Sequence, residues 1–374
     1  MLIQEKLTIR QFAVLTFITI IGDMILLYPT MVTYSAKQDA WICSLLSLPI
    51  GLFILWLMYK LHRTYPHMSL IEICPKVLGK WLGSVLSAAY LFYFLMGASI
   101  CIREVGDFMT TQIYLNTPIR AIIILFVVTL TWGMLKGLGT IGRSSELLAP
   151  IVVFSLLFLI IFLLPQAEVS RLKPFFNTPV FSMIDGSFRA AAASFGELII
   201  LSMIMPYVTH SSHLRRDMMF SALLGSALLT SLVLIALLVL GSTLTQHNVY
   251  ISYVLAQKIN VGNFFQRIEA LTAIAWLLST YFKSLLYVFG FVVGTAQLFR
   301  LKDYKPLTLP SMMLFFAMSI LISPNIVFYT TTIMYAWFDW DVTVSIVLPI
   351  FLLLVHQARA LFKKRRTKNT PLNK

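Results

Sequence analysis

The chain has 374 residues, of which 59% are hydrophobic and only 12% are charged, whereas a soluble domain carries roughly 25% charged residues. This composition excludes an ordinary soluble domain, and the continuous apolar runs predict membrane-spanning α-helices rather than the alternating strands of a membrane barrel. The net charge of +14 does not indicate nucleic-acid binding, because the basic residues lie mostly between the apolar runs, as in cytoplasmic loops of membrane proteins.

Ten membrane-spanning helices are predicted, within a single transmembrane domain that covers residues 1–374. The first five spans are Thr8–Tyr34, Asp39–Lys60, Leu82–Leu115, Pro118–Leu135 and Thr140–Leu164. After a polar linker, Gln166–Pro179, the second five are Ser182–Val208, Asp217–Thr243, Asn263–Phe299, Pro306–Ile322 and Asp341–Phe362. The segment Asn325–Trp340 is expected to form a short surface helix before the last span, and residues 363–374 a basic tail.

The distribution of Lys and Arg predicts the orientation of these spans. If the N-terminus is cytoplasmic, the segments on the inner side contain most of the basic residues, including the cluster KKRRTK at Lys363–Lys368. Cytoplasmic loops hold such an excess, so both termini are expected inside and the number of spans is expected to be even. The three cysteines, Cys43, Cys74 and Cys101, are widely spaced and predict neither a disulfide framework nor a metal site.

The first predicted span contains an acid within an apolar run, IIGDMILLYPT at Ile20–Thr30. An unpaired charge at the centre of a lipid-facing helix costs ~2.5–3.5 kcal/mol, so Asp23 is expected to face a protein cavity beside unwound backbone. The sixth span repeats the pattern. There, ASFGELIILSMIMP at Ala193–Pro206 places Glu197 directly after Gly196, with a proline in the same span.

These two spans each begin a block of five helices, and because five is odd the second block enters the membrane from the opposite side. That is the arrangement of an inverted repeat, expected here over residues 8–165 and 182–362, whose broken first helices meet near the midplane and form a binding site. Asp23 and Glu197 could there accept an ammonium group, coordinate a cation, bind sugar hydroxyls or carry a proton. The structural alternative is a local hydrogen bond from each carboxyl group to unwound backbone.

Lys283 lies near the middle of the eighth predicted span, where an ammonium group is costly without a partner. Either it takes the place of a coupling cation, with its charge held by backbone carbonyls or by Asp23, or it extends its stem to reach the headgroups. Its central position favours the internal role. Arg103 and Asp107, four residues apart on the third span, are expected to form an ion pair near the outer interface, with gating there as the alternative.

Signatures of enzymes such as G-x-S-x-G, H-E-x-x-H and the Walker A loop do not occur in the chain. We therefore expect no enzyme, with no catalytic residue, metal ion or cofactor. Asp339 and Asp341, in the segment FDWD, stand apart from other acids and are expected to be solvated at the membrane surface.

An ordered set of six segments covers most of the chain: IGDMILLYP, KQDAWI, SLIEICPKVLGKWLG, TPIRAII, FGELIILSMIMPY and QRIEALTAIAW. In this set the chain resembles the spore germination permease family, the integral-membrane B subunit of nutrient germinant receptors. That family belongs to the amino acid–polyamine–organocation transporter superfamily. The resemblance implies an all-α, leucine-transporter-like fold of five plus five inverted repeats, with a germinant pocket between the unwound parts of spans 1 and 6 and with spans 3 and 8 beside it.

Carried over by position, the resemblance implies seven ligand-binding residues: Gly22, Asp23 and Met24 in span 1, Phe195, Gly196 and Glu197 in span 6, and Lys283 in span 8. It also implies an A subunit and a lipoprotein C subunit as partners, in the inner membrane of a bacterial spore. The chain departs from the superfamily at Gly22-Asp23-Met24, where small residues usually admit a substrate carboxylate. An acid and a bulky thioether there disfavour a plain amino acid and favour a sugar, nucleoside, cation or amine.

Two functions fit these features. In the first, a receptor subunit binds a nutrient, and the bound state biases the scaffold and its partner subunits without net transport. In the second, a secondary transporter moves a small solute together with protons or another cation. Asp23, Glu197 and Lys283 could serve either function. A membrane-embedded enzyme is disfavoured because no catalytic constellation is present.

Overall fold

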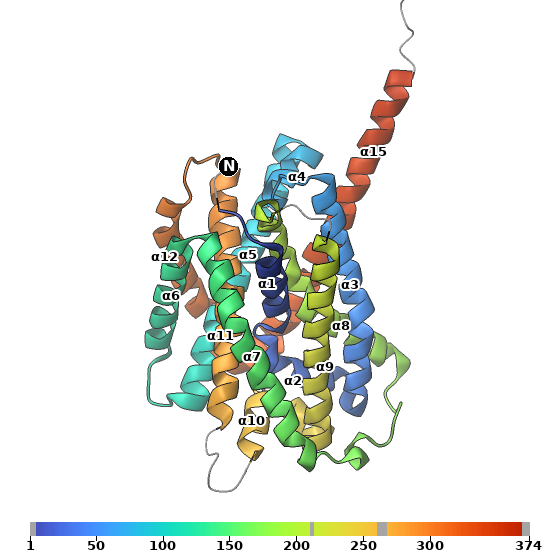
Figure 1. The fold of residues 1–374 in the computed structure, drawn as a ribbon, viewed down its shortest axis with the longest axis vertical. Helices are drawn as coiled ribbons and strands as arrows, with labels where there is room; N and C mark the ends of the chain where they lie inside the picture. The colour runs from blue at the N-terminus through green and yellow to red at the C-terminus, as the bar shows by residue number, and fades with distance from the viewer. Residues whose placement is uncertain (1–4, 210–212, 260–267, 369–374) are drawn as a thin grey trace, which may run out of the picture.

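The chain forms a bundle of helices that stand side by side along the long axis of the molecule (Figure 1). The computed structural model describes residues 5–209, 213–259 and 268–368. Its first half contains α1 (Ile9–Ile21), α2 (Met24–Ala36), α3 (Ala40–Thr64), α4 (Leu70–Leu78), α5 (Lys80–Phe108), α6 (Ile119–Lys136) and α7 (Leu138–Leu163). Its second half contains α8 (Val180–Phe195), α9 (Leu214–His247), α10 (Ile251–Lys258), α11 (Ile268–Leu298), α12 (Lys305–Leu321), α13 (Ile326–Phe328), α14 (Met334–Val342) and α15 (Leu348–Lys368). Short 3-10 or π-helical segments are Lys37–Asp39, Met109–Ile113, Leu164–Gln166, Val169–Leu172, Gly196–Met203, Met205–Tyr207, Tyr329–Ile333 and Thr343–Val347.

The described part of the chain contains helices and no strand, apart from an isolated bridge between Leu7 and Val208. Within it, seven helical stretches are long and apolar enough to cross a bilayer, and α1 and α12 are shorter apolar helices. Large apolar side chains such as Leu125 and Phe154 are exposed on the flanks, as a lipid-facing surface requires. The prediction of an all-α membrane protein is confirmed, whereas the number of ten spans stays a prediction.

The helices that begin the two predicted halves run side by side in opposite directions. α2 packs against α8, and α1 packs against the 3-10 segment Gly196–Met203 that follows α8. At the start of α1, the Leu7 N–H donates to the Tyr207 carbonyl and the Thr209 N–H donates to the Leu7 carbonyl, each over 2.9 Å. An inverted repeat requires this antiparallel arrangement. The repeat itself, and the single-domain boundary, stay predictions.

The predicted start of the last span, Asp341, is wrong. No surface helix precedes it, because α13, α14 and α15 join through two π-helical turns into one helical stretch that starts at Ile326. Tyr329, Trp337 and Phe338 of the expected surface segment are buried. Thr331, Thr332 and Asp339 of this segment are exposed, while its aromatic face packs inside the bundle.

The expectation that the chain has no enzyme motif is wrong for one glycine-rich segment. The segment GLGTIG at Gly137–Gly142 has the spelling G-x-G-x-x-G, which indicates dinucleotide binding only where it follows a strand. Here it follows α6 and opens α7, and the Gly139 N–H donates to the Glu5 carboxylate over 2.5 Å. The motif therefore forms a helix start that is capped by the N-terminal segment.

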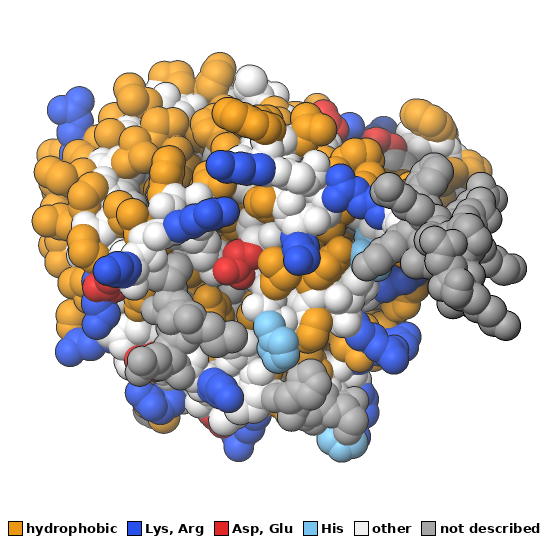
Figure 2. All heavy atoms as spheres, turned by 90° about the horizontal axis from the view of Figure 1, so that it is seen from above, with side chains coloured by type: hydrophobic (Ala, Val, Ile, Leu, Met, Phe, Trp, Pro, Cys, Tyr) orange, Lys and Arg blue, Asp and Glu red, His pale blue; other side chains and the backbone are white. Residues whose placement is uncertain are grey.

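Basic side chains gather at one end of the bundle. Figure 2 shows Lys and Arg spread over the end face that carries the N-terminus and α4, with apolar side chains around much of its rim. α4 connects the end of α3 to the start of α5, and these elements bring Lys60, Arg63 and Lys80 to this end. All three belong to the segments expected on the cytoplasmic side.

A buried acid holds the linker between the two predicted halves at the opposite end of the bundle. Asp39, in the turn between α2 and α3, is fully buried, and its carboxylate accepts the backbone N–H groups of Phe176 (2.9 Å) and Thr178 (3.0 Å). The linker between α7 and α8 is thereby tied to the turn that follows α2.

We predict that Asp39→Ala lowers the stability of the protein by about 1–3 kcal/mol, because two backbone donors lose their acceptor. A lower apparent melting temperature in detergent and faster trypsin cleavage after Arg171 would record the effect. Asp339→Ala, at an exposed position, is the matched control. Equal melting and equal cleavage of the two variants would show that the Asp39 contacts contribute nothing.

Candidate functional site

Helix α1 ends where α2 begins, at Gly22 and Asp23 near the centre of the bundle. The Gly22 N–H closes α1 by donating to the Ile18 carbonyl over 2.7 Å. The carbonyls released by the break are satisfied by α11: the Ser279 hydroxyl donates to the Gly22 carbonyl (2.8 Å) and the Trp276 indole N–H to the Asp23 carbonyl (3.0 Å). The predicted break in span 1 is therefore present, and hydrogen bonds from α11 stabilise it.

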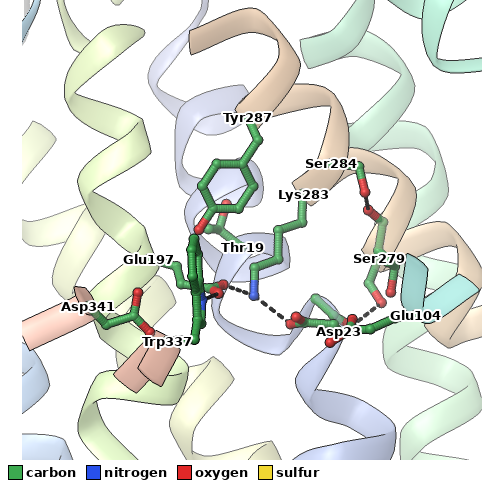
Figure 3. A network of polar contacts seen from close by, with 12 residues as sticks. Thr19, Asp23, Glu104, Glu197, Ser279, Lys283, Ser284, Tyr287, Trp337 and Asp341 are labelled. Carbon is green, nitrogen blue, oxygen red and sulfur yellow. Dashed lines mark hydrogen bonds and ion pairs between the residues drawn. The ribbon is translucent and has the colours of Figure 1, made fainter. Parts of the chain in front are cut away.

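Span 6 changes its geometry without a gap. α8 ends at Phe195, and the chain continues as a 3-10 helix from Gly196 to Met203. This tighter winding starts at the predicted glycine–acid pair, and Glu197 points toward Lys283 of α11 (Figure 3). The expectation of an unwound segment is thus replaced by a change of helix type.

The two glycines permit close approaches of other helices. A Cβ atom at Gly22 would lie 2.5 Å from Cδ of Lys283, and one at Gly196 would lie 2.6 Å from Cβ of Asp341. Gly22 therefore makes room for the stem of the lysine, and Gly196 lets the last helix pack against span 6.

Lys283 joins the two predicted halves. Its side chain is fully buried, its ammonium group lies 2.5 Å from Oδ1 of Asp23, and it forms a second ion pair with Oε2 of Glu197. Figure 3 shows the ammonium group between these two carboxyl groups. The structure therefore shows the internal alternative, with Asp23 as a partner, and not a lysine that reaches the headgroups.

A small cavity borders this ion-pair network. It has a volume of about 10 Å³, and one water molecule needs roughly 10–15 Å³ by this measure. Of the seven predicted site residues, Asp23, Met24 and Glu197 line it. Gly22, Phe195, Gly196 and Lys283 do not line it. Lys283 contacts the cavity only indirectly, through its ion pairs with Asp23 and Glu197.

The last helix supplies cavity residues that the sequence did not indicate. Trp337 donates its indole N–H to Oε1 of Glu197 over 2.7 Å and stacks on Tyr93 with ring centroids 4.7 Å apart. Tyr329 donates its hydroxyl to Oε1 of Glu104. Because the last span was expected to begin at Asp341, neither aromatic residue was placed inside the bundle.

Glu104 is a further site residue that the sequence analysis missed. It lies on α5 beside Arg103, and its side chain lines the cavity. Successive residues of a helix point about 100° apart, so Glu104 faces the cavity while Arg103 faces elsewhere. Its position next to the predicted pair Arg103–Asp107 was the available signal.

The predicted ion pair on span 3 is confirmed. Arg103 Nε lies 2.9 Å from Oδ2 of Asp107, and both side chains are buried. Arg103 also donates to the Ser323 carbonyl in the turn before the last helix. The pair therefore fastens α5 to the start of that helix.

The expectation for the FDWD segment is half wrong. Asp339 is exposed, whereas Asp341 is fully buried, and its Oδ1 accepts the Tyr93 hydroxyl over 2.6 Å. Side chains two residues apart on a helix point about 200° apart, so Asp339 faces outward and Asp341 faces the core. Asp341 therefore belongs to the buried acids around the site and not to the membrane surface.

A larger cavity lies next to the small one. It is lined by parts of α2, α8, the end of α9 and the last helix. Its volume of about 480 Å³ is within the usual range for small-molecule sites. We call it the vestibule. Both cavities share four lining residues, Leu27, Met31, Met334 and Phe338. These side chains separate the vestibule from the buried carboxyl groups.

Residues 6–327 match the family model described as spore germination protein. The chain belongs to the spore germination protein family. Two relatives from Bacillus subtilis (strain 168) illustrate the similarity. Spore germination protein KB is 27% identical over 325 residues, which cover 86% of each chain. Spore germination protein YndE is 22% identical over 304 residues, which cover 80% of this chain and 82% of the relative.

The solved structure of MhsT in complex with L-phenylalanine resembles this chain with a TM-score of 0.63 at 14% sequence identity. The match covers 93% of this chain and 97% of MhsT. The likeness shows the fold, and the leucine-transporter-like fold class expected from the sequence is confirmed.

We predict that Lys283→Met destabilises the protein by about 3–5 kcal/mol, because it leaves the Asp23 and Glu197 carboxyl groups buried without their cation. The triple variant Asp23→Asn/Glu197→Gln/Lys283→Met should regain much of this stability, since neither ion pair of Lys283 then leaves a charge without its partner. The apparent melting temperature in detergent measures both effects, with Lys136→Met, at an exposed position, as control. A single variant as stable as that control would contradict the pairing.

Proposed function

We propose that this protein is the membrane subunit of a nutrient germinant receptor, in which a small nutrient binds between spans 1 and 6 and signals spore germination through partner subunits. One observation carries the proposal: Lys283 bridges Asp23 from span 1 and Glu197 from span 6. Any ligand that enters between these spans must change that bridge. Membership in the spore germination protein family supports the biological role.

The signal follows from differential affinity. A ligand shifts a two-state equilibrium only by as much as it binds one state better than the other. In the described state the cavity beside Asp23 and Glu197 has a volume of about 10 Å³, which is too small for a nutrient. Binding therefore selects a state in which spans 1 and 6 and the last helix have moved apart, and partner subunits respond to that movement.

The vestibule supplies the route to this site. Its volume of about 480 Å³ accommodates a nutrient-sized molecule, and the side chains of Leu27, Met31, Met334 and Phe338 stand between it and the carboxyl groups. Methionine side chains change rotamer readily. Access then requires rotation of these four side chains together with a shift of the last helix.

The proposal includes an orientation and a location. The basic end face of Figure 2 lies on the cytoplasmic side, so the vestibule opens away from the cytoplasm and both termini are cytoplasmic. The membrane is the inner membrane of a bacterial spore, and the partners are an A subunit and a lipoprotein C subunit. The nutrient is an amino acid, a sugar, a nucleoside or a cation.

A cation-coupled transporter of small solutes is the second candidate. It is favoured by the pairing of an accessible vestibule with an occluded cavity, which alternating access requires. In that reading Asp23, Glu197 and Lys283 exchange partners during a transport cycle instead of signalling to other subunits.

We predict that spores carrying Asp23→Asn or Glu197→Gln require roughly tenfold more nutrient for half-maximal germination, a change of ~1.4 kcal/mol in binding, while membrane insertion is retained. The loss of one partner of Lys283 alters the bridge that the ligand must open. Germination rate against nutrient concentration measures the effect, with Asp339→Asn at an exposed position as control. Wild-type responses of both variants would remove the two carboxyl groups from the proposed site.

Flux separates the two candidates. We predict that proteoliposomes containing the purified protein bind the nutrient that triggers germination but do not accumulate it when a proton or sodium gradient is imposed. Protein-free liposomes provide the background. Accumulation above background would favour the transporter over the receptor.

A further inference from the structure

One oxygen of the buried carboxyl groups lining the small cavity lacks a partner. Glu104 is only 3% exposed, and its Oε1 accepts the Tyr329 hydroxyl. Its other oxygen, Oε2, has no hydrogen-bond partner among the described residues. A buried polar atom left in this way costs about 1–3 kcal/mol, and more when it is charged. A site that tolerates this cost is suited to a ligand that supplies the missing donor.

Asp23 lies next to the Glu104 carboxyl group. One oxygen of each carboxyl group, Asp23 and Glu104, and the sulfur of Cys101 all lie within 4.8 Å of one another. Lys283 contacts Asp23 through Oδ1, and Figure 3 shows Glu104 on the other side of Asp23 from the lysine. The lysine therefore contacts Asp23 and Glu197, while Glu104 contacts Tyr329 through Oε1 and, within the described chain, keeps Oε2 free for a donor that enters the cavity.

The balance of charge points in the same direction. Four buried acids surround the site, Asp23, Glu104, Glu197 and Asp341, and Lys283 is the one cation that contacts any of them in the described chain. Carboxyl groups that share a buried site repel one another when ionised. A ligand with a further negative charge would add to this repulsion, whereas a positive group would relieve it.

The walls favour an organic cation over a bare metal ion. Trp337, Phe338 and Tyr329 line the cavity, and aromatic faces attract ammonium groups. A metal ion needs several oxygen ligands, but the carbonyls at the break, those of Gly22 and Asp23, already accept side-chain donors from α11. The remaining lining is apolar and suits the carbon part of a ligand.

We propose that the nutrient carries an ammonium group which binds between Asp23 and Glu104, with its carbon skeleton against the aromatic residues of the last helix. This inference rests on the proposed function and names the chemical class of its ligand. The ammonium nitrogen donates to Glu104 Oε2 and to the Asp23 carboxylate. A molecule whose only charged group is a carboxylate is excluded, because the same two acids repel it.

Thermal stabilisation of the purified protein tests this class, because a ligand that binds only the folded state raises the melting temperature, and the shift grows with the logarithm of its concentration relative to its Kd. The probes are propylammonium chloride, sodium propionate and 1-propanol, which share a three-carbon chain, at equal ionic strength. We expect stabilisation by propylammonium that rises with the logarithm of its concentration above its Kd, and none by propionate or 1-propanol. Equal stabilisation by propionate or by 1-propanol would overturn the proposal.

Glu104→Gln locates the effect. Glutamine has the shape of a protonated glutamate but carries no negative charge. This variant should therefore bind propylammonium at least about tenfold more weakly, a loss of ~1.4 kcal/mol in binding free energy. Glu146→Gln is the matched control. The Glu146 carboxylate lies 2.8 Å from Nε of Arg10, and Glu146 does not line the cavity. Unchanged propylammonium binding in Glu104→Gln would show that the carboxyl group acts as a neutral acid, and would overturn the proposal. If this variant does not fold, the three probes on the wild-type chain still decide the ligand class.

The two proposals fail in different ways. Suppose that propylammonium binding depends on Glu104 but that spores lacking the protein germinate normally with every nutrient. That result would refute the receptor role and keep the ligand class. Germination that requires Asp23 and Glu197, in a protein that propylammonium does not stabilise, would keep the receptor role and refute the ligand class.

Discussion

The architecture of the centre depends on one ammonium group. Lys283 lies between the carboxyl groups of Asp23 and Glu197, in a position where any of the three charges alone would cost several kcal/mol. Each of these residues is therefore tolerable only because the others are in place. The same contact fixes the distance between span 1, span 6 and α11, which come from distant parts of the sequence.

The features around this contact follow from its geometry. Gly22 gives the lysine stem its space, and α11 satisfies the carbonyls that the break exposes. The last helix contributes Trp337 to Glu197, so movement of that helix and breakage of the ion pairs are coupled. A ligand that enters from the vestibule meets the last helix first and the ion pairs second, which is a suitable order for a receptor that converts binding into movement.

The sequence predicts the part of this site that is marked by local rules. A glycine followed by an acid within an apolar run indicates a break, and a lysine at mid-span requires a partner, so Asp23, Glu197 and Lys283 were found. Glu104 and Asp341 were not, because their burial depends on how α5 and the last helix are rotated, and a single chain does not record that rotation. The start of the last helix was also predicted wrongly, since exposed residues separate Tyr329 from Trp337 and Phe338, and a single chain does not record that this aromatic face packs inside the bundle.

The central claim is that Lys283 joins the two halves through Asp23 and Glu197. The most direct test is a cryo-electron microscopy map of the purified protein, held by an antibody fragment, at a resolution that shows side chains. The account predicts density for Lys283 that ends between the two carboxyl groups, with span 1 interrupted at Gly22 and a 3-10 helix after Phe195. Continuous α-helices in both spans, with Lys283 turned toward lipid, would contradict it.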